Sequence, residues 1–186
     1  MRELSLHILD LAQNSIAAGA SLVTIEINEN DEGFFVFSIK DNGCGMDEKM
    51  LRSVRDPFVT TRKTRKVGMG IPFLDMVTAQ CGGTFSLESQ VGLGTVLKAS
   101  FKEDNIDRPP LGDIVASMLV MIVANPQLDI VFIYKIGERG FTFDTREMRQ
   151  MLGEEADFSL PEVYTWIESY LRQQLDVLHA GQEEEE

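Results

Sequence analysis

The spacing of apolar and polar residues predicts the secondary structure of the first hundred residues. Leu4, Ile8, Leu11 and Ser15 recur at helical spacing, so we expect a helix over residues 6–18. The elements expected after this helix are strands at residues 22–28 and 34–39, a short helix at 47–54, a helix at 72–81, and strands at 84–88 and 95–101. This mixture of helices and strands indicates an α+β fold.

A polar segment with two prolines follows at residues 103–110, and we place a domain boundary there. The elements expected beyond it are an apolar helix at residues 111–124, an antiparallel pair of strands at 128–135 and 140–143, helix starts within 144–147 and 159–162, and a last helix at 161–178. Trp166 is expected in the core of this part. The predicted organisation is a domain at 1–102, a linker at 103–110, a small α+β domain at 111–179 and an acidic disordered tail at 180–186.

Composition and charge restrict the partners and the compartment. The chain of 186 residues carries a formal net charge of −13, which argues against a groove for nucleic acid. We find no apolar run long enough for a membrane span and no apolar signal core at the N-terminus. Cys44 and Cys81 lack the spacing of a disulfide framework or zinc site, which favours a cytoplasmic protein, and Cys44 is expected as a packed thiol.

The strongest candidate for a ligand site is the segment at residues 41–46, which follows an apolar strand. It has a carboxylate, Asp41, and two glycines, Gly43 and Gly45, which leave room for a flat ligand beside the backbone. Adenine fits, because its exocyclic amine can donate to the carboxylate, whereas guanine presents an acceptor there. Taken alone, the segment is equally compatible with a simple turn between a strand and a helix.

Three further motifs accompany this segment along the chain. Asp10 and Asn14 lie four residues apart, on one face of the first predicted helix. Gly68, Met69 and Gly70 form a second glycine turn before the helix at 72–81. A third motif, Gly94-Thr95, enters a strand.

In this order the motifs resemble the ATP-binding domain of gyrases, heat-shock chaperones, histidine kinases and mismatch-repair ATPases, over residues 1–102. Residues 56–61 most resemble the histidine-kinase branch. The resemblance implies a two-layer α/β sandwich with a mixed sheet, ATP and Mg²⁺ as ligands, and ATPase or protein kinase activity exerted with a protein partner. The whole chain also resembles stand-alone ATP-binding proteins found beside iron hydrogenases. The oligomeric state is left open, a dimer included.

The resemblance also implies roles for individual residues. Asn14 corresponds to the magnesium ligand of the family, although an asparagine here is also compatible with a plain surface position. Asp10 stands where the family usually has a glutamate that activates water, and it is one methylene shorter. Ala17 departs from the acid that some branches carry, and both departures indicate slow hydrolysis. The residues expected to contact the nucleotide are Asn14, Asp41, Gly43, Gly45, Met46, Thr61, Arg62, Lys63, Gly68, Met69, Gly70, Ile71 and Thr95.

Residues 52–66 are locally basic in an acidic chain. This segment lies where the family carries a mobile lid, so we expect Arg62 and Lys63 to contact phosphates. A solvated basic loop is the alternative. Two functions remain open at this point: an enzyme that splits ATP or passes its γ-phosphoryl group to a protein, and a non-catalytic module whose binding to a partner is gated by ATP.

Overall fold

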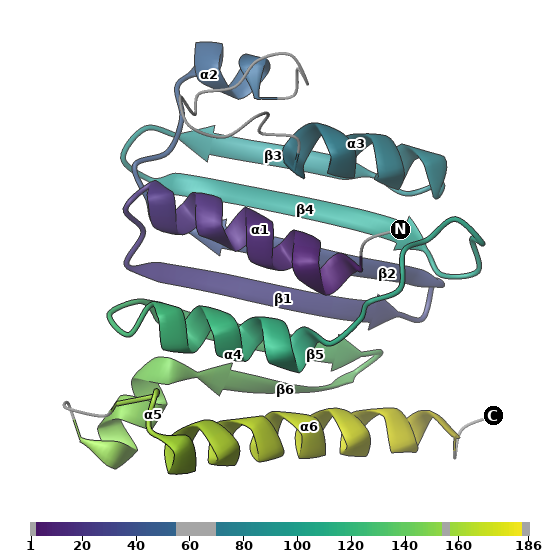
Figure 1. Ribbon diagram of the computed structural model, residues 1–186. Helices are drawn as coiled ribbons and strands as arrows, with labels where there is room; N and C mark the ends of the chain where they lie inside the picture. The colour runs from purple at the N-terminus through teal and green to yellow at the C-terminus, as the bar shows by residue number, and fades with distance from the viewer. Residues whose placement is uncertain (1–2, 55–69, 154–156, 184–186) are drawn as a thin grey trace.

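The computed structural model describes residues 3–54, 70–153 and 157–183, and within them six strands form one mixed sheet (Figure 1). The strand order across the sheet is β3-β4-β2-β1-β5-β6. The strands are β1 (Leu22–Asn30), β2 (Phe34–Asp41), β3 (Phe85–Gln90), β4 (Gly94–Lys102), β5 (Asp129–Ile136) and β6 (Arg139–Asp144). The helices are α1 (Leu4–Ala17), α2 (Glu48–Ser53), α3 (Gly70–Gln80), α4 (Ile114–Ala124), α5 (Thr145–Leu152) and α6 (Pro161–Glu183).

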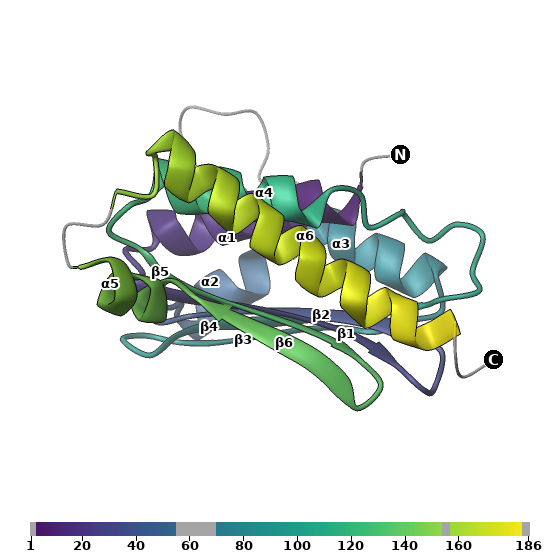
Figure 2. The ribbon, with the colours of Figure 1, turned by 90° about the horizontal axis from the view of Figure 1, so that it is seen from below.

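The fold has two layers, because α1, α3, α4 and α6 lie on one side of the sheet (Figure 2). Strand residues alternate accordingly: Ile25, Phe37 and Phe132 are fully buried under the helices, whereas Lys40 and Lys98 are exposed on the other face. The predicted α+β sandwich with a mixed sheet is therefore confirmed.

The C-terminal part of the chain joins the same sheet as the N-terminal part. β1 pairs antiparallel with β2 on one side and parallel with β5 on the other, and β6 pairs antiparallel with β5. The antiparallel pair expected near residues 128–143 is present, but it extends the sheet of the first hundred residues. Whether residues 1–102 and 111–179 act as separate folding units remains a prediction.

The end of the segment expected to be a linker, together with the residue after it, forms hydrogen bonds to the start of α1. The backbone amides of Leu4 and Ser5 donate to the carbonyls of Pro110 and Leu111 at 2.9 and 2.8 Å. Glu3, the N-cap residue of α1, makes no side-chain cap, so these two carbonyls satisfy amides that a helix N-terminus leaves unpaired.

The last helix differs from its prediction in two respects. It continues to Glu183, beyond the predicted end at residue 178 and into the segment expected to be a disordered tail, of which residues 184–186 lie outside the described part. Trp166 was expected in the core but is 50% exposed. Ile167 and Leu171, four residues apart, occupy the buried stripe of α6, and Trp166 falls on the flank of the helix, stacked on Tyr170.

Candidate functional site

A cavity of about 480 Å³ opens between α1, α2, α3 and the sheet. This volume falls within the range of roughly 300–1,000 Å³ that is common for small-molecule sites. The residues predicted from the sequence that line it are Asp10, Asn14, Asp41, Gly45, Met46, Gly70, Ile71 and Thr95. The other predicted residues include Thr61, Arg62, Lys63, Gly68 and Met69, which lie outside the described residues.

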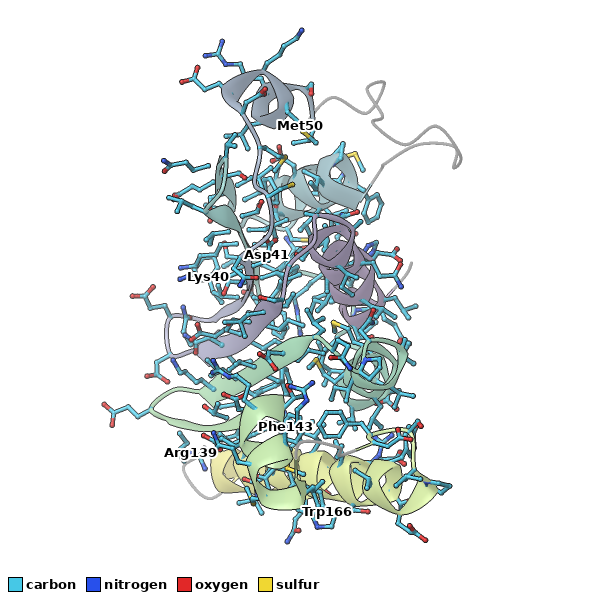
Figure 3. The ribbon with its side chains drawn as sticks, turned by 90° about the vertical axis from the view of Figure 1, so that its left-hand side faces the viewer. Lys40, Asp41, Met50, Arg139, Phe143 and Trp166 are labelled. Carbon is cyan, nitrogen blue, oxygen red and sulfur yellow. The ribbon has the colours of Figure 1, made fainter. Side chains whose placement is uncertain are left out.

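Asp41 is a buried carboxylate in the wall of this cavity, with 7% of its surface exposed (Figure 3). Its Oδ1 accepts hydrogen bonds from the backbone amides of Gly43 at 2.9 Å and Thr95 at 3.2 Å. Its Oδ2 accepts a hydrogen bond of 2.6 Å from the Ser15 hydroxyl. Three donors from α1, β4 and the loop after β2 therefore fix the carboxylate in one orientation. Gly43, the remaining predicted residue, does not line the cavity, and its backbone amide instead helps to hold Asp41 in place.

Two glycines keep the backbone close around this carboxylate. Gly45 has φ of +67°, and a Cβ atom there would lie 2.0 Å from the carbonyl oxygen of Gln90. Gly94 has φ of +98°, and its Cβ would lie 2.0 Å from the carbonyl oxygen of Asp41. A side chain at either position would push the loop away from the β3–β4 turn. The second glycine of the predicted segment is therefore required by the packing of two loops.

Side chains that the sequence analysis did not single out hold the loop after β2. Asn42 Oδ1 accepts hydrogen bonds from the backbone amides of Ser21 and Leu22, both at 2.9 Å. The Met46 amide donates to the Ser89 hydroxyl at 2.8 Å. Of the missed residues, Ser15 alone had a signal in the sequence, because it lies in the apolar stripe of α1, where a hydroxyl needs a buried partner.

The polar face of α1 contributes Asp10, Gln13 and Asn14 to the cavity. All three are exposed, so their oxygens are accessible to a ligand. His7, one turn earlier, is buried and stacks on Phe73 of α3, with ring centroids 4.9 Å apart. This contact packs His7 between α1 and α3.

The rest of the cavity has apolar walls and one helix N-terminus. The larger apolar side chains that line it are Leu11, Ile39, Met46, Met50, Val54, Ile71, Leu87 and Leu97. α3 begins at Gly70, which lines the cavity. The first backbone amides of a helix of this length attract negative charge. Cys44 also lines the cavity and is exposed, so the expected packed thiol is wrong: its neighbours Gly43 and Gly45 turn the loop such that Cys44 faces outward.

The arrangement suits a ligand with a flat apolar part and an anionic part. No group of three or more His, Cys, Asp or Glu side chains in the described residues is arranged to hold a metal ion. The oxygens of Asp10, Gln13 and Asn14 suit Mg²⁺ instead, since this ion takes few protein ligands and completes its shell with water and phosphate.

Comparison with known proteins agrees with this geometry. Residues 2–105 match the family described as histidine kinase-, DNA gyrase B-, and HSP90-like ATPase. A sensor kinase, CckA, of Brucella abortus is 25% identical over 153 residues, which are 70% of this chain and 16% of the kinase. The tetrathionate sensor histidine kinase TtrS of Salmonella typhimurium is 32% identical over 96 residues, which are 50% of this chain and 16% of that protein.

A putative sensor protein of Shewanella frigidimarina is 26% identical over 102 residues, which are 54% of this chain and 15% of that protein. This chain therefore spans about one sixth of the length of these relatives. Among solved structures, the N-terminal domain of a DNA repair protein matches with a TM-score of 0.52 at 14% identity, over 77% of this chain and 52% of that one. That likeness concerns the fold alone. No described helix is long and apolar enough to cross a membrane.

Proposed function

Because this chain belongs to the family of histidine kinase-, DNA gyrase B- and HSP90-like ATPases, we propose that it binds Mg-ATP in the cavity beside Asp41 and turns it over slowly, by hydrolysis or by phosphoryl transfer to a protein partner. Membership of this family implies ATP binding. The magnesium ion, the reaction and the partner are parts of the proposal.

The single observation that carries the proposal is the hydrogen bonding of Asp41. A carboxylate offers about four acceptor positions, and three are used by Ser15, Gly43 and Thr95. The remaining capacity is available to one more donor from the cavity. The exocyclic amine of adenine supplies such a donor, whereas the carbonyl of guanine would leave the buried acceptor without one. The apolar walls at Ile39 and Leu97 suit the faces of the base.

The triphosphate would extend from the base toward the N-terminus of α3. Gly70 and Ile71 line this part of the cavity, and the helix dipole there favours phosphate. We assign the basic residues Arg62 and Lys63 to the same role from the sequence alone, since they lie outside the described residues.

Asn14 would hold Mg²⁺ through its side-chain oxygen, and the ion would neutralise charge on the phosphates. Asp10 lies one helical turn before Asn14 and would accept the proton of the attacking water. Its side chain is a methylene shorter than glutamate, and a displacement of about 1 Å can cost roughly a hundredfold in rate. We therefore expect turnover well below about 10 per second.

A phosphate-release assay with γ-labelled ATP tests this function. The wild-type chain should release phosphate slowly. Asp10→Asn should abolish release and retain ATP binding, because Asn14 is unchanged, whereas Asn14→Ala should weaken both. Partly exposed Asp75, on α3 and absent from the cavity lining, provides the matched control, since Asp75→Asn should change neither.

The sensor kinases among the relatives support a protein partner. Label that appears on a protein from cell extract would indicate phosphoryl transfer. ATP binding with no release and no transferred label would contradict catalysis and leave a nucleotide-gated binding module. Failure to bind ATP at all would contradict the whole proposal.

A further inference from the structure

The outer flank of α6 carries a mostly apolar stripe that the described residues leave partly exposed. Trp166, Tyr170, Gln173 and Val177 recur at spacings of four, three and four residues, which places them on one side of the helix. Trp166 is 50% exposed and Val177 is 66% exposed, whereas Tyr170 is partly buried against Phe143 of β6. These four residues are called the α6 stripe below.

The α6 stripe lies at the end of the molecule, beyond the last strand of the sheet. α6 follows β6 at the lower edge of Figure 1, and Figure 3 shows Trp166 farther out than Phe143. The opposite flank of α6 lies toward α4, since Arg172 pairs with Asp113, which caps α4. The stripe therefore lies on the flank of α6 away from α4, with Trp166 and Val177 exposed and Tyr170 against β6.

The stripe is self-complementary about a twofold axis. In an antiparallel pair of α6 helices whose axis passes between Leu171 and Arg172, Trp166 of one copy meets Val177 of the other. Tyr170 then meets Gln173, so the tyrosine hydroxyl has a polar neighbour. Spacings of four and three are those by which helices pack side by side.

Charge complementarity agrees with the same register. The twofold axis places Glu162 of one copy opposite Gly181 of the other. The side chain of Arg139 lies beside Gly181, because a Cβ on Gly181 would meet the Nη1 atom of Arg139 at 1.4 Å. Glu162 is exposed at the start of α6, and the guanidinium of Arg139 lies near its end, so an acid faces a base at both ends of the pair.

We infer that the α6 stripe is the interface of a homodimer formed by antiparallel packing of two α6 helices. The 23 residues of α6 span about 35 Å, and a helix is about 10 Å wide. The footprint is thus roughly 350 Å² per copy, below the about 800 Å² per partner of standard interfaces, so we expect a weak dimer that forms only at high concentration. This inference does not rest on ATP binding, because the α6 stripe shares no residue with the cavity.

Sedimentation equilibrium of the full chain between about 1 µM and about 1 mM tests the inference, since a weak dimer dissociates on dilution across this range. The wild-type chain should change from monomer to dimer. Trp166→Glu should remain monomeric throughout. Val120→Glu is the matched control: Val120 is a similarly exposed apolar residue, 53% exposed, but lies on α4, so this variant should dimerise like the wild type.

A charge exchange tests the antiparallel register. Glu162→Arg and Arg139→Glu should each weaken dimerisation several-fold, and the double variant should restore it. Circular dichroism of each variant identifies one that fails to fold. A wild-type chain that stays monomeric overturns the inference, as does a dimer that Trp166→Glu leaves intact. Single charge variants that the double variant does not rescue overturn the antiparallel register.

Discussion

At the scale of single residues, the site depends on positions where the backbone has no room for a side chain. Gly45→Ala should lower the free energy of unfolding by about 2–4 kcal/mol, because it combines a left-handed backbone with a Cβ 2.0 Å from the Gln90 carbonyl. Gly92 provides the control: its φ is +78°, but nothing lies within 4 Å of a Cβ there. Gly92→Ala should cost only about 1–2 kcal/mol.

Urea unfolding of the two variants measures this difference. Equal losses for Gly45→Ala and Gly92→Ala would contradict the close approach of the two loops. A larger loss at Gly45 that is accompanied by weaker ATP binding would agree with the role given to the loop after β2.

The sequence predicted Asp41, its glycines and Thr95, but not Ser15, the third group that orients the carboxylate. Asp41, Gly43 and Gly45 are recognisable because they are close together in the chain. Ser15, by contrast, is 26 residues from Asp41, and only the packing of α1 on β2 brings its hydroxyl to the carboxylate. Spacing along a sequence carries no direct information on such a pair.

At the scale of elements, Asp144 is both the last residue of β6 and the N-cap of α5. It accepts hydrogen bonds from the Arg146 side chain and backbone amide, and those from the side chain contribute most to holding the pKa of Asp144 below its ordinary value. A carboxyl with a lowered folded-state pKa stabilises the fold above its ordinary pKa of about 3.9, and this contribution is lost as the pH falls through the lowered value.

Asp144→Asn should therefore reduce stability at neutral pH by about 1 kcal/mol and make the decline of stability below about pH 5 less steep. Asparagine retains a capping oxygen, so the helix itself should persist. Urea unfolding between neutral pH and about pH 3 measures both effects. Wild-type and variant curves that run parallel over this range would show that the charge of Asp144 has no part in stability.

The capping signal at residues 144–147 was readable in the sequence, and α5 begins at Thr145 as expected. The orientation of α6 was less predictable. Val163, Trp166 and Tyr170 are apolar like Ile167 and Leu171, so the local pattern did not reveal which flank of the helix faces the core. That choice follows from contacts with α4 and β6.

At the scale of the whole molecule, β1 and β5 pair in parallel although about 100 residues separate them. Tyr134 of β5 is fully buried, its hydroxyl donates to Glu29 of β1 at 2.5 Å, and burial raises the pKa of this tyrosine above its ordinary value. Parallel pairing over such a distance leaves no local signal. Because no such signal showed that both halves of the chain share a sheet, the polar, proline-containing segment at 103–110 was predicted to be a linker.

The shared sheet leads us to expect one cooperative unfolding transition. Far-ultraviolet circular dichroism reports on the whole chain, and Trp166, the single tryptophan, reports on α6. The two signals should give the same urea midpoint, as in two-state unfolding. Two separate midpoints would instead support independent domains at residues 1–102 and 111–179.

The central claim, that Asp41 selects adenine in a nucleotide cavity, is tested most directly by titration calorimetry with Mg-ATP and Mg-GTP. The wild-type chain should bind ATP and prefer it clearly to GTP. Asp41→Asn should weaken ATP binding by about 1–3 kcal/mol, the cost of leaving a buried partner unsatisfied. Equal affinity of the wild-type chain for ATP and GTP would contradict the assignment.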